Sequence, residues 1–494
     1  MSNPVVVIGG GISGLSAAFY LHKLGHTFLK HQKIILLEGS ERMGGWMHSK
    51  RMDDGVIHEL GPRSIRFAGD SGTNTLLLVE SLGLSKEVIA VSKREPAAKK
   101  RLLYLNDQFV QLPNGFLDLF KKKPPFKQRF YKYLLDEQKK PKLELKDDDD
   151  ISVYDFIEKR FDKDIADFII DPLCRGITAG DAKKLSMKSA FPQLFKLERE
   201  HGSLIKGLLR PTIRKRTEQE IHDLLSSRLL REAKAQKWSM WSLRNGIQTL
   251  PEKLADYLHN LEDHRVEIYK DSKVTQIDFD GDIANITIKT PDETVELQSS
   301  HVFSAIPANS LSKCLNSDRF SKFRDRLNSI EHINVAVVNL EFLGKNRLKD
   351  RGFGFLTPSS SKSPLLGVTF DSSSFPQQDA GKDITRVTCM IGGTSFSLSN
   401  GSAENQEKHL KLLKTAIEWI KKCLAFEDEP IRYNVAINEY NVGHSRTLNA
   451  IDDEIKAKRC NMSLIGASYR GISVNECIHN SRQAVVNFFN SNNK

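Results

Sequence analysis

Three glycines near the start of the chain have the spacing of a nucleotide-binding turn. They are Gly9, Gly11 and Gly14, which follow the β-branched run Val5–Ile8 and precede a helical stretch at about residues 13–24. The first glycine permits a tight turn, the second lets backbone N–H groups approach a pyrophosphate, and the third lets the helix pack closely on the sheet. The free N–H groups and the dipole of the helix N-terminus would hold the anion. The pattern predicts a dinucleotide site.

An acidic residue follows at the position that such a site requires. The next apolar strand, Ile34–Leu37, ends on Glu38, at about the expected spacing of ~20 residues after the last glycine. Its carboxylate could accept hydrogen bonds from both ribose hydroxyls and would repel a 2′-phosphate. The alternative is a solvated glutamate that only ends a surface strand. The two strands and the helix between them predict a βαβ unit.

A second glycine pair decides between nucleotides. Gly44 and Gly45 follow Arg42, where a loop would pass the diphosphate again. A nicotinamide enzyme has no evident need of such a pair, whereas FAD enzymes of the glutathione reductase and amine oxidase types carry RxGG after the ribose acid. An ordinary turn is the alternative. The segment favours FAD, and Arg63, in the segment HELGPRSIR, could either hydrogen-bond the flavin region or pair with an acid.

The C-terminal segment supplies a complementary helix terminus. A short apolar strand at residues 462–465 is followed by a glycine turn and by Ser473-x-x-Glu476, the form of a capping box that begins a helix. The positive end of its dipole would face whatever lies above the strand, and in a flavoprotein we expect this to be the pyrimidine edge of the isoalloxazine. Cys477 lies on the apolar side of this helix, where a packed thiol is favoured over a covalent flavin anchor. We therefore expect noncovalent FAD.

Composition limits the class of protein. The chain has 494 residues, of which 39 % are hydrophobic and 27 % charged, which excludes wholesale disorder and a polytopic membrane protein. The net charge of +11 favours anionic partners, but the basic clusters carry no nucleic-acid motif. The six cysteines form no CxxC pair, so we expect no metal. Glycines interrupt the uncharged run at residues 4–21, so neither a membrane span nor a cleavable presequence is favoured.

Three regions of the chain differ in pattern. Basic clusters alternate with aromatic and aliphatic groups from about residue 93 to 237, where helices are expected. Short β-branched segments separated by turn residues resume after Trp238. Later segments at 336–340, 367–370 and 387–391 predict another sheet before the final strand and helix.

Motifs spread along the whole chain resemble those of one family. In order, they are GGGISGL, SERMGGW, HELGPRSIR, PAAKKRLLYL, CRGITAGD, WSLRNGIQTLP, SAIPA, RGFGFLTP, LLGVTFDS, VTCMIGG, YNVGH and GASYRGISVNECI. The set is similar to that of oxygen-dependent protoporphyrinogen oxidases of the eukaryotic mitochondrial type, in the FAD-containing monoamine-oxidase superfamily. The glycine motif is generic, whereas the later motifs are specific to this family.

The resemblance implies an α/β plus α+β fold of three domains. A Rossmann-like FAD-binding domain would be assembled from the discontinuous segments 1–92, 238–300 and 432–494, with a helical membrane-binding domain at 93–237 and a mixed-sheet substrate domain at 301–431. The implied activity is the six-electron oxidation of protoporphyrinogen IX to protoporphyrin IX, with dioxygen as acceptor and hydrogen peroxide as by-product, the penultimate step of haem synthesis. Flavin N5 would accept the hydride, so no catalytic side chain is assigned.

The resemblance also implies binding residues. Arg101 would hold a substrate propionate, and Phe353, Leu356, Thr369 and Met390 would sandwich the tetrapyrrole rings. The chain departs from the family at Thr369, where an aliphatic residue is common, and at Ser64 and Ser481, where glycine is common. FAD contacts are implied at Gly9, Gly10, Gly11, Ile12, Ser13, Gly14, Glu38, Gly39, Arg42, Gly45, Trp46, Gly61, Pro62, Arg63, Ser64, Val274, Ala467, Ile472, Ser473 and Val474.

Partners and location follow mainly from the resemblance. Basic and aromatic side chains between about 93 and 216 would contact a membrane surface with anionic lipid, although a solvated helical domain with its aromatics packed inside is the alternative. The implied location is peripheral, on the inner mitochondrial membrane facing the intermembrane space, with ferrochelatase as a neighbouring enzyme; a homodimer stays open. Amine oxidases and carotenoid desaturases share the N-terminal motifs, and an inactive flavin-binding scaffold or a basic lipid-binding module would also explain the charge. The pocket motifs favour the porphyrinogen oxidases.

Overall fold

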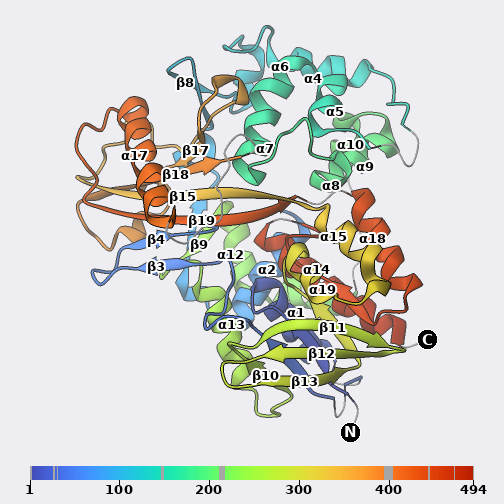
Figure 1. Cartoon of the computed structure of the whole chain (residues 1–494). Helices are drawn as coiled ribbons and strands as arrows, with labels where there is room; N and C mark the ends of the chain where they lie inside the picture. Colours follow the sequence, from blue (N-terminus) through green and yellow to red (C-terminus); the bar gives the residue numbers. More distant parts are fainter. Residues whose placement is uncertain are drawn as a thin grey trace.

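The computed structural model describes residues 3–25, 28–29, 32–145, 150–210, 217–393, 404–442, 445–471 and 473–492. Figure 1 shows three layers: a group of helices from residues 130–208 at one end, a long β-sheet across the middle, and a second sheet with its helices at the end where both termini lie. Within the described ranges, no helix has the length and apolar character needed to cross a bilayer.

The sheet nearest the termini is parallel and has the strand order β10-β2-β1-β14-β20. Its central strand, β1 (Val5–Ile8), is buried throughout, as expected for a parallel strand that is covered on both faces. The strands on either side are β2 (Ile34–Leu37) and β14 (His301–Ser304), and the outer strands are β10 (Val266–Tyr269) and β20 (Met462–Leu464). Strands that lie far apart in the sequence therefore build one sheet.

Alternate side chains of β1 enter two different cores. Val5 and Val7 face a helical core, whereas Val6 and Ile8 face a core shared with an antiparallel sheet. The first core includes α1 (Ile12–Leu24), α2 (Gly69–Ser81), α12 (Arg228–Ala235), α13 (Thr249–His259) and α19 (Val474–Asn492), with α11 (Glu218–Ser226) beside it. The second includes β11 (Lys273–Asp280), β12 (Ile283–Lys289), β13 (Thr294–Ser299), α14 (Ala308–Cys314), α15 (Ser321–Asn328) and α18 (Ser445–Ala457).

The middle layer is a seven-stranded sheet with the order β19-β15-β18-β17-β16-β7-β8. Its bounds are β7 (Leu102–Leu105), β8 (Gln108–Gln111), β15 (Glu331–Leu343), β16 (Gly354–Leu356), β17 (Leu365–Thr369), β18 (Ile384–Gly392) and β19 (Arg432–Val442). One face packs on α17 (Glu404–Leu424). Short elements around the sheet are α3 (Pro96–Lys99), α16 (Asp371–Ser374), the hairpin β3 (Ser49–Arg51) and β4 (Ile57–Glu59), and the small sheet of β5 (Ile65–Arg66), β9 (Trp238–Leu243) and β6 (Val88–Ser92).

The third layer is helical and has its own core, which includes Tyr133, Phe156 and Met187. Its helices are α4 (Phe130–Lys139), α5 (Val153–Arg160), α6 (Lys163–Ile165), α7 (Asp171–Thr178), α8 (Met187–Ala190), α9 (Pro192–His201) and α10 (Leu204–Leu208), preceded by a 3-10 turn at Phe116–Phe120. Helix α7 packs on β16 and β17, which joins this layer to the middle sheet.

Strand pairing moves three of the expected domain boundaries. β7 and β8, expected in a helical region, belong to the seven-stranded sheet because β7 pairs with the distant β16. β14, α14 and α15, expected in a substrate domain, pack with the parallel sheet and its second core. β19, expected in the FAD-binding domain, pairs with β15 along its whole length. The division into three domains itself stays a prediction.

Candidate active site

The glycine turn after β1 brings backbone against backbone. A Cβ added at Gly14 would lie 1.9 Å from the carbonyl oxygen of Gly9, and Gly9 has a φ of +104°. A side chain at Gly14 would push α1 away from the turn, and a side chain at Gly9 would be strained. The geometry therefore requires glycine at both positions.

Gly11 and Gly45 lie close together, backbone to backbone, at the N-terminus of α1. The loop after β2 returns to the turn, where the Gly44 N–H donates to the Gly10 carbonyl oxygen at 2.9 Å. Among the described residues, a Cβ added at Gly11 would meet only the Cα of Gly45, at 4.0 Å. No side chain of the described residues caps the first N–H groups of α1. The backbone thus leaves room for an anion beside free helix N–H groups, which fits the diphosphate of FAD.

Glu38 holds its carboxylate over this turn. Oε2 accepts the Gly10 N–H at 2.6 Å, and Oε1 accepts the backbone N–H and the hydroxyl of Ser40 at 2.9 and 2.7 Å. A carboxylate has about four acceptor sites, so one remains for a ribose hydroxyl. The three bonds fix the carboxylate where the sequence places the ribose.

Arg42 supports the glycine loop from within. Its guanidinium donates to the carbonyl oxygens of Met43, Met47 and Gly45. Burial lowers the pKa of Arg42, although its charge is partly balanced by Glu38. The structure directs the guanidinium at the loop itself, and the FAD contact that the sequence predicts for Arg42 stays a prediction.

The C-terminal segment reaches the same turn. A Cβ added at Gly466 would lie 3.6 Å from the Ser13 hydroxyl oxygen. The Glu476 N–H donates to the Ser473 hydroxyl at 3.3 Å and the Ser473 N–H donates to the Glu476 carboxylate at 3.2 Å, so the predicted capping box forms. Cys477 is buried, and burial raises the pKa of its thiol to about 11, as expected for a packed neutral side chain.

The other predicted FAD residues surround the cradle. A Cβ added at Gly61 would lie 1.9 Å from the Trp46 carbonyl oxygen, so the two loops touch there. Gly39 lies against Lys273, next to the buried Val274. Ile472 lies outside the described residues. The remaining predicted positions are buried or half-buried around these loops: Ile12, Ser13, Pro62, Ser64, Ala467 and Val474.

One face of the seven-stranded sheet gathers most of the predicted substrate residues. Leu356, Gly367 and Met390 form a cross-strand row on β16, β17 and β18. Thr369 and Thr388 pair in the next row on the same face, two residues along the strands. The intervening side chains belong to the core on the opposite face. The structure therefore brings together Leu356, Thr369 and Met390, which the sequence separates.

Arg63 joins the loop that contains Gly61 to this sheet face. Its guanidinium donates to the Thr369 hydroxyl at 2.5 Å and lies 3.5 Å from the Asp371 carboxylate. The Thr369 hydroxyl donates in turn to Asp371 at 2.9 Å. Arg63 thus pairs with an acid, as one of the two sequence-based alternatives expects, and its contact with the flavin region stays a prediction.

Arg101 lies at the start of β7, beside Phe353. The guanidinium carbon is 5.9 Å from the centre of the Phe353 ring, and Nη1 donates to the Ala97 carbonyl oxygen at 3.3 Å. Burial and the positive charge of Arg66 lower the pKa of Arg101. A half-buried guanidinium on an aromatic ring is suited to bind a carboxylate.

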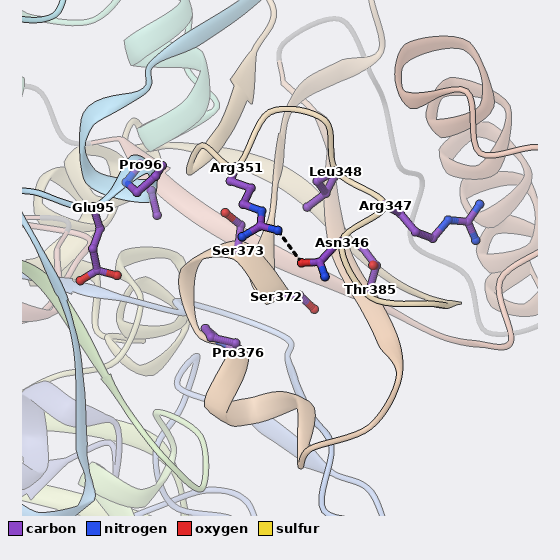
Figure 2. Close-up of a pocket in the computed structure, with 11 residues that line it drawn as sticks. Glu95, Pro96, Asn346, Arg347, Leu348, Arg351, Ser372, Ser373, Pro376 and Thr385 are labelled. Carbon is purple, nitrogen blue, oxygen red and sulfur yellow. Dashed lines mark hydrogen bonds between the residues drawn. The ribbon is translucent and has the colours of Figure 1, made fainter.

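A separate cavity of about 280 Å³ lies beside the start of α3 (Figure 2). Arg351 and Asn346, which are hydrogen-bonded at 2.8 Å, line it together with Glu95. Ala97, whose carbonyl oxygen accepts from Arg101, lines the cavity, but none of the predicted binding residues does. Its charged walls do not suit a flat hydrophobic macrocycle.

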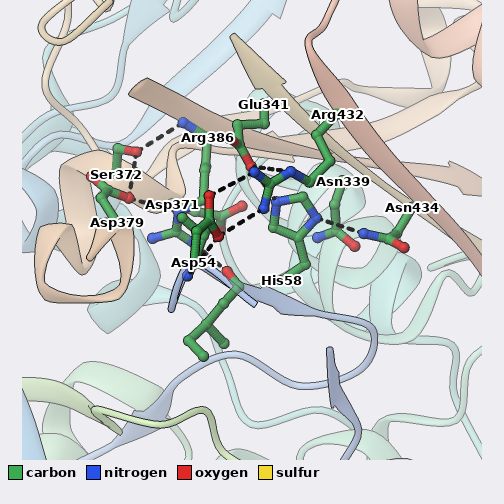
Figure 3. A network of polar contacts seen from close by, with 12 residues as sticks. Asp54, His58, Asn339, Glu341, Asp371, Ser372, Asp379, Arg386, Arg432 and Asn434 are labelled. Atoms are coloured by element: carbon green, nitrogen blue, oxygen red, sulfur yellow. Dashed lines mark hydrogen bonds and ion pairs between the residues drawn. The ribbon is translucent and has the colours of Figure 1, made fainter. Parts of the chain in front are cut away.

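A buried polar network closes the other end of the sheet face (Figure 3). His58 on β4 lies with Nε2 3.1 Å from the Glu341 carboxylate on β15, and both side chains are 1 % exposed. Arg386 on β18 donates to Asp379 at 2.6 Å and to the Ile57 carbonyl oxygen at 2.7 Å. The network docks β4 on the sheet, so the face is charged and closed at one end and apolar around Met390 at the other.

The sequence did not single out several polar residues of the site. Asp371 stands two residues after Thr369 in the segment LLGVTFDS, and a carboxylate so close to a predicted substrate residue was an available signal. His58 and Glu341 carry no such signal, because they pair from strands far apart in the chain. No group of residues that could hold a metal occurs in the described ranges.

Comparisons with known proteins relate the whole chain to flavoenzymes. A family model described as flavin containing amine oxidoreductase matches residues 12–436. Protoporphyrinogen oxidases of Bos taurus and Homo sapiens are 38 % and 37 % identical over 493 and 491 residues, which is 98 % of each chain. A crystal structure from Exiguobacterium sp. 255-15, described as a candidate protoporphyrinogen oxidase, has a TM-score of 0.73 at 21 % identity over 99 % of both chains. The last likeness shows the fold alone, and the predicted α/β plus α+β fold class is confirmed.

Proposed function

The chain belongs to the flavin-containing amine oxidoreductases, and on this premise we propose that it oxidises protoporphyrinogen IX to protoporphyrin IX with FAD as cofactor and dioxygen as acceptor. The observation that carries the proposal is the identity of 37–38 % to protoporphyrinogen oxidases over 98 % of both chains. Six electrons leave the macrocycle, and three molecules of dioxygen take up two electrons each to form hydrogen peroxide. Haem synthesis would consume the product.

The residues of the chain bind and orient rather than react. FAD supplies the hydride acceptor when it is bound. The glycine turn and α1 would hold its diphosphate, and Glu38 its ribose. The face around Leu356 and Met390 offers an apolar surface to a flat macrocycle and excludes water, while Arg101 would hold a propionate. The electron-rich pyrroles assist loss of hydride from a bridging carbon, so no side chain is assigned as general base.

A turnover assay tests the proposal. The purified protein with bound flavin should convert protoporphyrinogen IX to the fluorescent protoporphyrin in air, with three molecules of hydrogen peroxide formed per porphyrin, and turnover should stop when oxygen is removed. Primary amines offered under the same conditions should give no peroxide. A protein that binds FAD and oxidises amines but not the porphyrinogen would refute the substrate assignment and favour an amine oxidase.

Peripheral binding to an anionic membrane is the second part of the proposal. Phe116 and Leu117 in the 3-10 turn are 73 % and 74 % exposed, and Leu209 after α10 is 76 % exposed. The turn and α10 both pack on α4, so these apolar side chains belong to one region, and Lys121 and Lys122 lie next to it. Exposed apolar side chains beside cations favour insertion among anionic headgroups.

Liposome flotation tests the membrane contact. The protein should float with vesicles that contain anionic lipid at low salt, and Phe116→Ser/Leu117→Ser should weaken this binding about tenfold. Leu343→Ser is the matched control, because Leu343 is 62 % exposed on the middle sheet, away from the helical layer. Equal flotation of the double variant and the native protein would exclude this surface.

Location and protein partners complete the proposal. We expect the chain on the inner mitochondrial membrane, facing the intermembrane space, with transfer of its product to ferrochelatase; self-association as a homodimer is also expected. Fractionation with protease protection checks the location, and light scattering of the purified holoenzyme checks the dimer. Transfer to ferrochelatase would appear as haem formation that a porphyrin trap in solution cannot intercept.

A further inference from the structure

Arg66 and Arg101 reach one small core from two different sheets. Arg66 ends β5 and pairs with Met240 on β9, whereas Arg101 directly precedes β7 in the seven-stranded sheet. Met240 shares a core with Ala97, and Phe353 packs against that core. Arg101 contacts both Ala97 and Phe353. Paired residues of neighbouring strands share a face, so Arg66 lies on the Met240 side, toward Arg101.

The two guanidinium groups have no counter-charge of their own. Arg66 is exposed and Arg101 is half-buried, and neither forms an ion pair with the rest of the described chain. Although Arg66 is exposed as a whole residue, partial burial of its guanidinium lowers its pKa, and burial together with the positive charge of Arg66 lowers the pKa of Arg101. Two unpaired cations repel each other. An anion between them is attracted by both and offsets their repulsion.

We propose that Arg66 is a further substrate-binding residue, and that Arg66 and Arg101 together bind the two propionates on one edge of the tetrapyrrole. The inference rests on the proposed function, because the two propionates of protoporphyrinogen IX lie on neighbouring pyrroles and leave the macrocycle edge as two adjacent carboxylates. Guanidinium groups bind carboxylates through charge-assisted, often bidentate, hydrogen bonds. Two cations separated by a short gap match two such carboxylates.

The pair also determines how the macrocycle lies. With its propionate edge at Arg66 and Arg101, the ring system extends over Phe353 toward the apolar row of Leu356 and Met390. The opposite edge, which carries no carboxylate, then meets the helical layer, where Met390 packs. A ligand without acids would keep the apolar contacts and lose the orientation.

A comparison of the Kd values for the product and for its ester shows whether the charge of Arg66 binds a carboxylate or the side chain only supports the fold. The probes are protoporphyrin IX and its dimethyl ester, titrated into the flavin-loaded protein and followed by the change in porphyrin absorbance. Arg66→Gln should raise the Kd of the diacid about tenfold and change that of the ester less than about twofold. Arg66→Lys should restore part of the affinity, and Lys99→Gln, which removes an exposed charge from the neighbouring α3, should change neither value.

Three outcomes would overturn the inference. An unchanged Kd for the diacid removes Arg66 from the site, and a tighter Kd shows that its charge only opposes Arg101. Equal losses for the diacid and the ester point to a structural role for the side chain. In each of these cases the native protein would still oxidise the porphyrinogen, so the proposed function would stand. If the native protein neither oxidised the porphyrinogen nor bound the diacid, both the proposed function and this inference would be wrong.

Discussion

Two charged regions of the molecule differ in whether their charges have partners. One is the buried network around His58 and Glu341, and the other is the pair of Arg66 and Arg101. In the network the charged groups have partners from other elements: Glu341 on β15 has His58 on β4, and Arg386 on β18 has Asp379 in the turn Pro376–Asp379. Arg66 and Arg101, by contrast, form no ion pair with any acid among the described residues. The open space beside Gly11 resembles the second case, since free N–H groups of α1 face it without a side-chain cap.

The difference separates charges that hold the fold from groups that bind ligands. A buried charge without a partner is strongly unfavourable, so a structural charge must be neutralised within the chain. A ligand-binding group keeps its bonding capacity because the ligand supplies the partner. Variants of the network should therefore lower stability, and variants of the unpaired groups should lower binding at nearly unchanged stability.

The largest effect is expected at Gly11. Gly11→Val should abolish FAD binding and activity, because a branched side chain would fill the space that the diphosphate needs. Flavin absorbance of the purified variant measures this loss, and far-UV circular dichroism should show a folded chain. Flavin released from the native protein by acid precipitation would agree with noncovalent FAD, while flavin retained on the denatured chain would contradict it.

Arg386 should give the largest loss of stability. Arg386→Met leaves Asp379 buried without its ion pair and should lower the free energy of unfolding by about 3–5 kcal/mol. Chemical denaturation followed by tryptophan fluorescence measures the change. Arg347→Met is the matched control, because its partner Asp428 is exposed and the stability should hardly change. If both variants lose the same stability, burial of the network does not matter.

Glu59, at the closed end of the sheet face, should make the free energy of unfolding depend on pH. Burial raises the pKa of Glu59 to about 7, although the Ser49 hydroxyl and the Ile247 N–H donate to its carboxylate. The folded protein thus binds the proton more tightly than the unfolded chain, whose group titrates near 4.5. This contribution is present below about pH 4.5 and is lost as the pH rises to about 7, a change of about 3 kcal/mol.

Replacing Glu59 isolates its titration. Glu59→Gln should lack this fall in stability between pH 5 and 7, so the difference in Tm between the native protein and the variant should vary with pH in that window. A constant difference across the window would show that Glu59 keeps an ordinary pKa.

The smallest effect is expected at Arg101, where one charge-assisted hydrogen bond is lost. Arg101→Ala should raise KM for protoporphyrinogen by roughly 10- to 150-fold, which corresponds to about 1.5–3 kcal/mol, with flavin content and Tm unchanged. Lys99→Ala should leave KM as it is. Unchanged kinetics in the arginine variant would mean that the unpaired charge binds no substrate. The claim that unpaired charges mark ligand-binding groups would then be wrong for Arg101.

Local constraints made part of the site predictable from sequence. The strand, the glycines and the helix of the cradle are close neighbours in the chain. A Cβ at Gly14 would lie 1.9 Å from the Gly9 carbonyl oxygen, and Gly9 has a positive φ, so both positions require glycine. The capping box of Ser473 and Glu476 acts within three residues, and Glu38 accepts from Ser40 two residues further on, although its bond to the Gly10 N–H spans 28 residues. These constraints arise within single elements or within one βαβ unit, so the residue types and their spacing record them.

Only the tertiary structure decided which distant segments meet. β7 lies among basic residues and joins a sheet through β16, and Arg63 takes as its partner Asp371 at the start of the distant short helix α16. Arg66 becomes a candidate for substrate binding only because β5 brings it to the core that Arg101 also reaches. The sequence by itself determined the nucleotide cradle, the family and the alternation of the strands. The partner of each charge was decided by packing, because pairing energy depends on distance in space and leaves no periodic signal along the chain.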